Sequence, residues 1–162
     1  FLFWIDQTHF HFLVSQEGTP GLNHPDSRPG QYQSELWKYD VAEFFLLSSD
    51  KNRYLEFNLA PNGGWWSSEF CAPLIPAPGE PLPIPNVQTS AEVNRDGWRA
   101  RASIPLSWLQ KNYGFSKSTC LNACFILNSP DQIFVSASNL GDGNPDYHRP
   151  KQFPPLDPIT LA

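Results

Sequence analysis

The 162-residue sequence predicts an all-β fold, an antiparallel β-sandwich of the immunoglobulin or jelly-roll kind with long irregular loops. Three observations support this prediction. Apolar and polar residues alternate in short segments, turn residues recur at short spacing, and almost no segment shows the 3.6-residue apolar period of a helix. The 17 prolines also favour strands and rigid loops over helices.

Residues 1–162 are expected to form one domain, because this length supplies one core but is too short for two domains of ordinary size. The segment Ala72–Asn86 contains six prolines and resembles a linker in composition. We interpret it as an extended excursion over the surface, since the hairpins on either side of it are too small to fold alone.

The first strand is expected over Phe1–Val14, with a break or turn near Asp6. His9 and His11 fall on one face of it, opposite the alternating phenylalanines. Two histidines are too few for a metal site without a third ligand, so a solvated strand face is the favoured interpretation.

A β-hairpin around a short polar loop is expected at the centre of the fold. Its second strand, Tyr54–Ala60, alternates strictly, which is typical of a half-buried strand. If Leu47 pairs with Tyr54, then Glu43 faces Asn58 on the outer face, and the apolar residues of both strands face the core.

The other elements follow from turn residues and alternation. One helical turn is expected over Pro105–Gln110, with Trp98 and Trp108 packed into the core, and a long loop is expected over Ser15–Ser34. The remaining strands, in chain order, are expected at Val87–Asn94, Trp98–Ile104, Cys120–Asn128, Gln132–Ala137 and 153–161.

The net charge of −5 and the pI near 5.2 argue against a nucleic-acid partner, which needs a surplus of Lys and Arg. No apolar run approaches the ~20 residues of a membrane span, so no membrane partner is expected. The oligomeric state is left open by the sequence.

The chain begins at Phe1 and contains no methionine, so we expect that an upstream segment, such as a signal peptide, has been removed. A secreted, periplasmic or cell-surface location follows from that expectation. The three cysteines allow at most one internal disulfide. Free, partly buried thiols are favoured, and an oxidised pair that includes Cys71 is the alternative.

Four pieces of sequence, in this order, resemble the family 9 carbohydrate-binding modules and the wider set of DOMON-like β-sandwiches. These pieces are Trp37-x-x-Asp40-x-x-Glu43-Phe-Phe-Leu, Tyr54-x-Glu-Phe-Asn, Trp98-x-x-x-x-x-Ile-Pro and Asp146-Tyr-His-Arg-Pro-Lys-Gln-Phe153. The resemblance extends over nearly the whole chain. It implies non-catalytic binding of a sugar or of a polysaccharide end.

The resemblance also implies roles for single residues. Trp37 and Tyr147 match the two aromatic platforms that hold a terminal sugar, and Glu43 matches the carboxylate acceptor. Asn58 stands where the family often has arginine, and Asn144 matches a further polar position. Tyrosine offers a smaller platform, and asparagine lacks the forked donor of arginine, so affinity or sugar preference should differ from the family's.

Two tryptophans, Trp65 and Trp66, follow a pair of glycines, and this places at least one indole in or beside a turn. An exposed indole there is a further candidate sugar platform. The alternative is that one ring caps the core and the other covers the proline-rich segment.

Other functions remain open. Of the local carboxyl pairs only Glu43 with Glu56 falls on one face and is worth testing for glycoside hydrolysis. The sequence shows no general-acid environment for it, so no enzyme activity is expected. A haem-binding sandwich is disfavoured by the lack of methionine, and a structural module without a sugar ligand is the main alternative. No cofactor is expected beyond structural calcium, for which Asp40, Asp142 and Asp146 are candidates.

Overall fold

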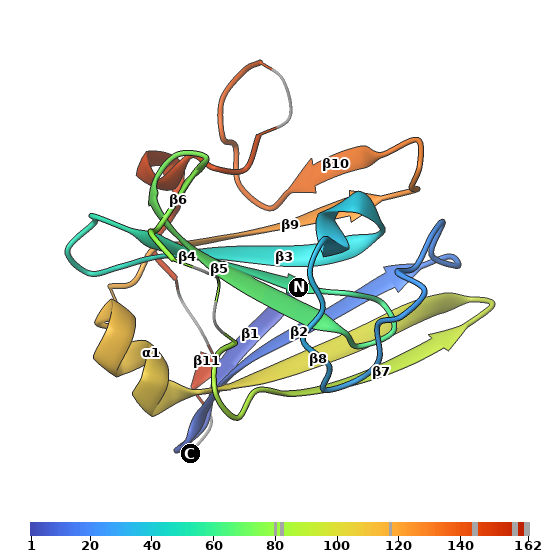
Figure 1. Cartoon of the computed structure of the whole chain (residues 1–162), viewed down its shortest axis with the longest axis horizontal. Coiled ribbons are helices and arrows are strands. Elements are labelled where there is room, and N and C mark those ends of the chain that lie inside the picture. The colour runs from blue at the N-terminus through green and yellow to red at the C-terminus, as the bar shows by residue number, and fades with distance from the viewer. Residues whose placement is uncertain (80, 82, 117, 144–145, 157–158, 161–162) are drawn as a thin grey trace.

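Two β-sheets pack face to face, which confirms the predicted β-sandwich (Figure 1). The computed structural model describes residues 1–79, 81, 83–116, 118–143 and 146–156, together with the backbone of residues 159–160. No helix in this part of the chain is long and apolar enough to cross a membrane.

The strands of each sheet come from distant parts of the chain. The first sheet consists, in spatial order, of β11 (Ile159–Thr160), β1 (Leu2–Ile5), β2 (His9–Glu17), β8 (Gly97–Pro105) and β7 (Gln88–Asn94). The second consists of β10 (Ile133–Ser136), β9 (Leu121–Leu127), β3 (Val41–Leu47), β4 (Tyr54–Leu59), β5 (Trp65–Ala72) and β6 (Ile75–Pro76). All neighbouring pairs are antiparallel except β1 with β11.

Among the described residues, three helical segments lie outside the sheets: η1 (Leu36–Lys38), α1 (Leu106–Tyr113) and η2 (Pro150–Gln152). Helix α1 is longer than the single turn expected at Pro105–Gln110. It ends at Gly114, whose φ of 62° gives the left-handed conformation that glycine adopts without a Cβ clash.

The predicted central hairpin has the predicted register. Leu47 is opposite Tyr54 and Glu43 is opposite Asn58 in the pairing of β3 with β4. Strand β9 pairs with the other edge of β3, so β3 lies in the interior of the six-stranded sheet.

The main core fills the space between the two sheets. Phe44 lies near its centre, stacked on Phe57 at 5.1 Å between ring centroids and in edge contact with Phe10 and Phe12. Trp98 is buried there as predicted, and its indole N–H donates to the Gln16 side chain at 2.7 Å. The largest fully buried side chains of this core are Phe10, Phe12, Phe44, Phe57, Leu46, Leu59, Ile104 and Leu109.

The expectation of a half-buried strand at β4 is wrong, because both faces of this strand are covered. Tyr54, Glu56 and Asn58, which point away from the main core, are also buried. A second apolar cluster, built from outer-face residues such as Phe45 and from Leu36, Leu140, Tyr147 and Phe153, covers them. Residues of η1 and of the segment after β10 therefore cover part of the outer face.

The first predicted strand is broken as expected, and Asp6 explains the break. Its carboxylate accepts from the backbone N–H groups of Thr8 and His9 at 2.8 Å each, which holds a turn between β1 and β2. The expectation of a solvated histidine face is wrong for His11, which is buried and hydrogen-bonded to Asp6 and Ser103 at 2.8 and 2.9 Å.

Candidate functional site

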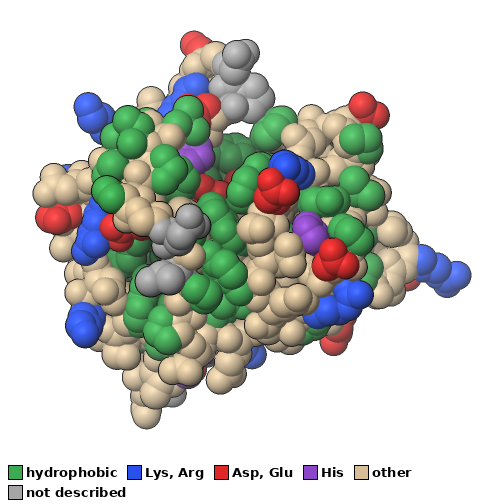
Figure 2. Space-filling view, viewed as in Figure 1, with side chains coloured by type: hydrophobic (Ala, Val, Ile, Leu, Met, Phe, Trp, Pro, Cys, Tyr) green, Lys and Arg blue, Asp and Glu red, His purple; other side chains and the backbone are tan. Residues whose placement is uncertain are grey.

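An open cavity of about 720 Å³ lies on the outer face of the six-stranded sheet. Figure 2 shows this face hollowed, with hydrophobic side chains around the hollow and acidic atoms inside it. Six aromatic side chains line the cavity: Trp37, Phe45, Trp66, Phe70, Phe134 and Tyr147. Its main polar groups belong to Glu43, Glu56, Ser68, Asp146 and His148.

One aromatic wall is formed by Trp37 and Trp66. Trp37 lies in η1, where the buried side chain of Leu36 anchors the turn against the sheet and leaves the indole 37% exposed. Trp66 lies on β5 with its ring centroid 4.9 Å from that of Trp37 and the ring planes inclined by 58°. The wall is therefore buried at Trp66 and open to solvent at Trp37.

Tyr147 contributes a second aromatic surface. Its hydroxyl donates to the backbone carbonyl oxygens of Phe125 at 2.8 Å and Val135 at 3.3 Å, which fixes the ring beside Phe134. Burial raises the pKa of the Tyr147 phenol above its usual range, so the hydroxyl remains a donor. The residue is 8% exposed, so only the part of the ring that lines the cavity is open to a ligand.

Two buried carboxyl groups, Glu43 of β3 and Glu56 of β4, also line the cavity. Burial raises the pKa of Glu56 to about 7, partly offset by the Asn58 amide that donates to its Oε1 at 3.1 Å. Burial, and then the nearby Glu56 carboxylate, raise the pKa of Glu43 well above its usual range. At neutral pH the pair therefore carries far less than two negative charges, and the protonated members donate hydrogen bonds.

His148 lies beside Glu56. Its Nδ1 is hydrogen-bonded to the Tyr54 hydroxyl at 2.8 Å, and its Nε2 is 3.7 Å from Glu56 Oε2. Burial lowers the pKa of His148, and the Asp146 carboxylate only partly offsets this. The imidazole is therefore neutral at neutral pH and does not compensate a charge on Glu56.

Of the seven residues predicted for the site, the structure brings four together: Trp37, Glu43, Trp66 and Tyr147 line the cavity. Asn58 is fully buried on the same outer face as Glu43 and acts through Glu56, to which it donates. Within the described residues its Oδ1 has no hydrogen-bond partner. Asn144 lies outside the described residues.

Trp65 does not belong to this site, which corrects the prediction. It is buried in the main core, stacked on Phe57, and its N–H donates to the Gly30 carbonyl at 3.4 Å. Adjacent residues of a strand point to opposite faces, so only one of the paired tryptophans can reach the outer face, and that one is Trp66.

The predicted calcium ligands do not form a site. Asp40 is buried, and its two carboxylate oxygens accept from the backbone N–H groups of Gly21 at 2.8 Å and Ser129 at 2.7 Å. Asp146 lines the cavity, and Asp142 contacts Arg149 through its backbone carbonyl. Among the residues that the structure describes, no group of three or more His, Cys, Asp or Glu could hold a metal ion.

Glu56 and His148 were not selected from the sequence as site residues. The alternation of β4 already puts Glu56 on the face of Asn58, so this pattern was a usable signal. His148 had no such signal, because its position depends on how the segment after β10 packs against β4. The three cysteines are free: Cys71 is exposed, Cys120 is half-buried and Cys124 is buried with its thiol donating to Glu43 Oε2 at 3.6 Å.

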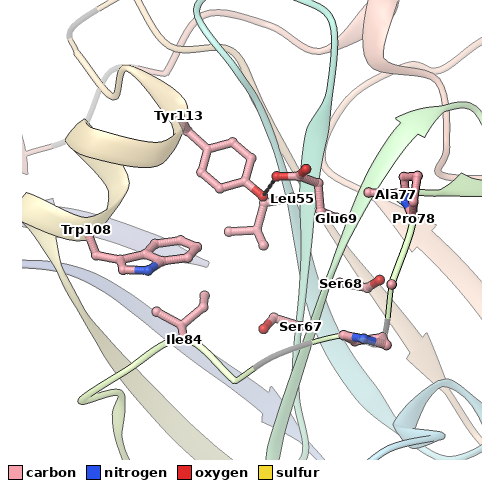
Figure 3. A pocket seen from close by; sticks show the side chains of 11 residues that line it. Leu55, Ser67, Ser68, Glu69, Ala77, Pro78, Ile84, Trp108 and Tyr113 are labelled. Atoms are coloured by element: carbon pink, nitrogen blue, oxygen red, sulfur yellow. Dashed lines mark hydrogen bonds between the residues drawn. The ribbon is translucent and has the colours of Figure 1, made fainter.

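A smaller cavity of about 200 Å³ lies between β5 and α1 (Figure 3). Trp108, expected in the core, is only partly buried and lines it. The Tyr113 hydroxyl and the Arg53 guanidinium both donate to Glu69 Oε2, at 2.7 and 3.0 Å. Since this carboxylate is already paired, the cavity that contains Trp37 is a stronger candidate for a binding site than this one.

Comparison with known sequences shows relatives along most of the chain. It is 31% identical over 165 residues to the UPF0462 protein C4orf33 homolog of Mus musculus, covering 88% of this chain and 74% of the relative. The homolog of Rattus norvegicus is 28% identical over 170 residues, covering 92% and 75%. No family model matches the chain.

Comparison with solved structures shows the same fold in carbohydrate-binding proteins. A putative carbohydrate-binding protein from Bacteroides uniformis matches with a TM-score of 0.62 at 17% identity, covering 90% of this chain and 70% of that one. A family 9 carbohydrate-binding module from Caldicellulosiruptor kristjanssonii, in complex with cellotriose, matches with a TM-score of 0.59 at 14% identity, covering 99% and 74%. The predicted resemblance to family 9 modules is thus confirmed for the fold, while the DOMON-like resemblance stays a prediction.

Proposed function

The chain belongs to the UPF0462 family, and we propose that it binds carbohydrate, without cleaving it, in the cavity on its six-stranded sheet. The observation that carries the proposal is the meeting of Trp37, Trp66 and Tyr147 with Glu43 and Glu56 in one open cavity. These side chains come from η1, β3, β4, β5 and the segment after β10. The cavity therefore forms only when segments from distant parts of the chain come together.

The cavity matches the two chemical faces of a pyranose. The C–H face of a sugar ring packs on aromatic rings, and the exposed indole of Trp37 offers such a surface. Sugar hydroxyls need both donors and acceptors, which the protonated or ionised carboxyls of Glu43 and Glu56 and the hydroxyl of Ser68 supply. The volume lies within the roughly 300–1,000 Å³ of small-ligand sites.

The structural neighbours support this class of ligand. Two structures of family 9 modules from Caldicellulosiruptor kristjanssonii with this fold contain bound cellotriose and glucose, respectively. At 14% and 13% identity these likenesses establish the fold only, so the two sugars serve as first probes rather than as the assigned ligand.

Binding is favoured over hydrolysis by the structural neighbours, which are named as carbohydrate-binding proteins. A glycosidase needs one carboxyl to be ionised as base or nucleophile while the other supplies a proton. Burial raises the pKa of both Glu43 and Glu56, so a test for hydrolysis accompanies the binding test. Asp40 cannot replace either, because its oxygens accept from two loop amides.

The test first screens the native protein on a glycan array. It then titrates the protein with glucose and cellotriose, and tryptophan fluorescence and calorimetry measure the binding. The native protein should bind at least one saccharide with a change in fluorescence, and Trp37→Ala should abolish that binding while the protein stays folded. Trp108→Phe is the matched control, since Trp108 lies in the smaller cavity. Unchanged binding by Trp37→Ala, or no binding to any glycan, would refute the proposal.

Catalysis is tested in the same samples. The saccharide that binds should be recovered intact after prolonged incubation, with no new reducing ends. Release of new reducing ends that depends on Glu43 or Glu56 would overturn the non-catalytic assignment. The secreted, periplasmic or cell-surface location stays a prediction.

A second candidate, an interaction module, is favoured by strand β10. This strand lies at the edge of the six-stranded sheet and exposes Ile133, Phe134 and Val135. Light scattering of the native protein and of Ile133→Lys distinguishes the two functions. A change from a larger assembly to the monomer in the variant, without any glycan binding in the native protein, would favour the interaction module.

A further inference from the structure

A second cavity, of about 860 Å³, adjoins the candidate site. Asp146 and His148 line both cavities, so their side chains form the boundary between the two. The walls of the second cavity come from the loop between β3 and β4, the end of β5 and the segment that contains η2. These segments lie on one side of the molecule (Figure 1).

The two cavities differ in charge. Lys51, Arg53, Arg149 and Lys151 line the second cavity, and Asp146 is the one carboxylate among its described lining residues. These are four of the 11 lysines and arginines of a chain whose net charge is −5. The described lining of the candidate site, in contrast, contains three carboxyl groups and no lysine or arginine.

The two arginines are held in place by hydrogen bonds. Arg53 donates to Glu69 Oε2 at 3.0 Å and to the Asn112 carbonyl, and Arg149 donates to the Leu140 carbonyl at 2.7 Å. Their positive charges are therefore held beside the cavity, although Glu69 partly compensates that of Arg53, and Asp146, with Oδ2 3.8 Å from Arg149 Nε, partly compensates that of Arg149.

The two lysines are more available. Lys51 and Lys151 are exposed, and within the described residues neither ammonium group has a carboxylate within 4.0 Å. Both can reach an anion without first breaking an ion pair. Between them, the buried side chains of Leu47, Tyr54 and Phe153 provide an apolar base. A cavity with an apolar base and a cationic rim suits a ring that carries an anionic substituent.

We propose that the ligand is an acidic oligosaccharide, with a neutral pyranose in the Trp37 cavity and the carboxylate or sulfate ester of a neighbouring sugar in the cavity of Lys51 and Lys151. This inference rests on the proposed function. An anionic group is attracted by the cations of the second cavity, whereas the described lining of the first cavity offers it no lysine or arginine. The difference in charge therefore sets the direction in which the oligosaccharide lies.

The experiment compares three probes with the full chain by calorimetry at low and high ionic strength. The probes are cellotriose, the same trisaccharide with one glucuronate residue, and the same trisaccharide with one sulfate ester. Both acidic probes should bind about tenfold more tightly than cellotriose at low ionic strength, and this preference should shrink in high salt. The stronger of the two identifies the anionic group.

The variants locate the preference. The double variant with Lys51→Gln and Lys151→Gln should lose the preference for acidic probes. Its affinity for cellotriose should stay within about twofold of that of the native protein. Lys111→Gln, exposed on α1 and outside both cavities, should preserve it. Trp37→Ala should weaken the binding of all three probes.

Each of the other outcomes overturns a defined part of the proposal. Equal affinity for cellotriose and the acidic probes, lost together in Trp37→Ala, overturns the acidic ligand and leaves carbohydrate binding in place. Acidic probes that bind Trp37→Ala as tightly as the native protein show an anion site without a sugar platform, which also overturns the inference. If no probe and no other glycan binds, the proposed function itself fails.

Discussion

Replacing Glu56 by glutamine should stabilise the folded protein at pH 8 and remove much of its pH dependence above pH 5. The Glu56 side chain is only 7% exposed, in the candidate cavity, and accepts a hydrogen bond from Asn58 at 3.1 Å. Burial raises its pKa from 4.5 to about 7, because an ionised carboxylate loses hydration in the folded state. Glutamine keeps the shape and an acceptor oxygen but carries no charge to desolvate.

The direction and size of the effect follow from proton linkage. Below about pH 4.5, Glu56 is protonated in both the folded and the unfolded state, so its ionisation does not lower the free energy of unfolding. Between pH 4.5 and about 7 the unfolded chain loses this proton while the folded protein keeps it, so the free energy of unfolding falls as pH rises. At about 1.4 kcal/mol for each pKa unit, the full loss is about 3 kcal/mol. The raised pKa of Glu43 acts in the same direction.

Urea unfolding of the native protein and of Glu56→Gln at pH 5 and pH 8 measures this difference. The native protein should lose about 2.5 kcal/mol more than the variant between the two pH values, because part of the full loss already occurs below pH 5. Glu92→Gln, an exposed substitution on β7, should behave like the native protein. Equal losses in the native protein and Glu56→Gln would refute the reasoning, because they would mean that the folded state does not desolvate this carboxyl.

The remaining predictions concern packing and loop attachment. Phe44→Ala should lower the free energy of unfolding by about 3–5 kcal/mol, since it empties the centre of the main core, and a loss under about 1 kcal/mol in urea unfolding would contradict that placement. Asp40→Ala leaves two loop amides without their acceptor and should cost about 1–3 kcal/mol, while calcium or a chelator should leave the melting temperature of the native protein unchanged. Trp65→Ala and Trp66→Ala should each cost about 3–5 kcal/mol of stability, because both rings are buried, but only Trp66→Ala should also weaken glycan binding in calorimetry; weaker binding in Trp65→Ala alone would show that the two rings are exchanged between faces.

The central hairpin could be predicted because its information is local. The alternation of apolar and polar residues after Tyr54 assigns each side chain to a face, and the short polar loop sets the register. As predicted, Glu43 and Asn58 share one face of the sheet. Trp37 and Glu43 line the same cavity on that face. Whether this cavity binds sugar is a separate question that the glycan titration answers.

The paired tryptophans show where local information ends. The sequence determines that Trp65 and Trp66 point to opposite faces of a strand, but not which face meets the other sheet. That choice depends on pairing with β4, where Trp65 is opposite Leu59 and Trp66 is opposite Asn58.

Taken by itself, the sequence determined the β-sandwich, most of its strands and the faces of the central hairpin, because alternation and turn residues act over a few neighbouring positions. Only the tertiary structure decided that the outer face of β4 is buried and that a basic cavity adjoins the cavity lined by Glu43 and Glu56. Both depend on contacts such as that between Tyr54 and His148, which are 94 residues apart in the chain. Such contacts form only when the segment after β10 folds back over the sheet, and no local pattern encodes that packing.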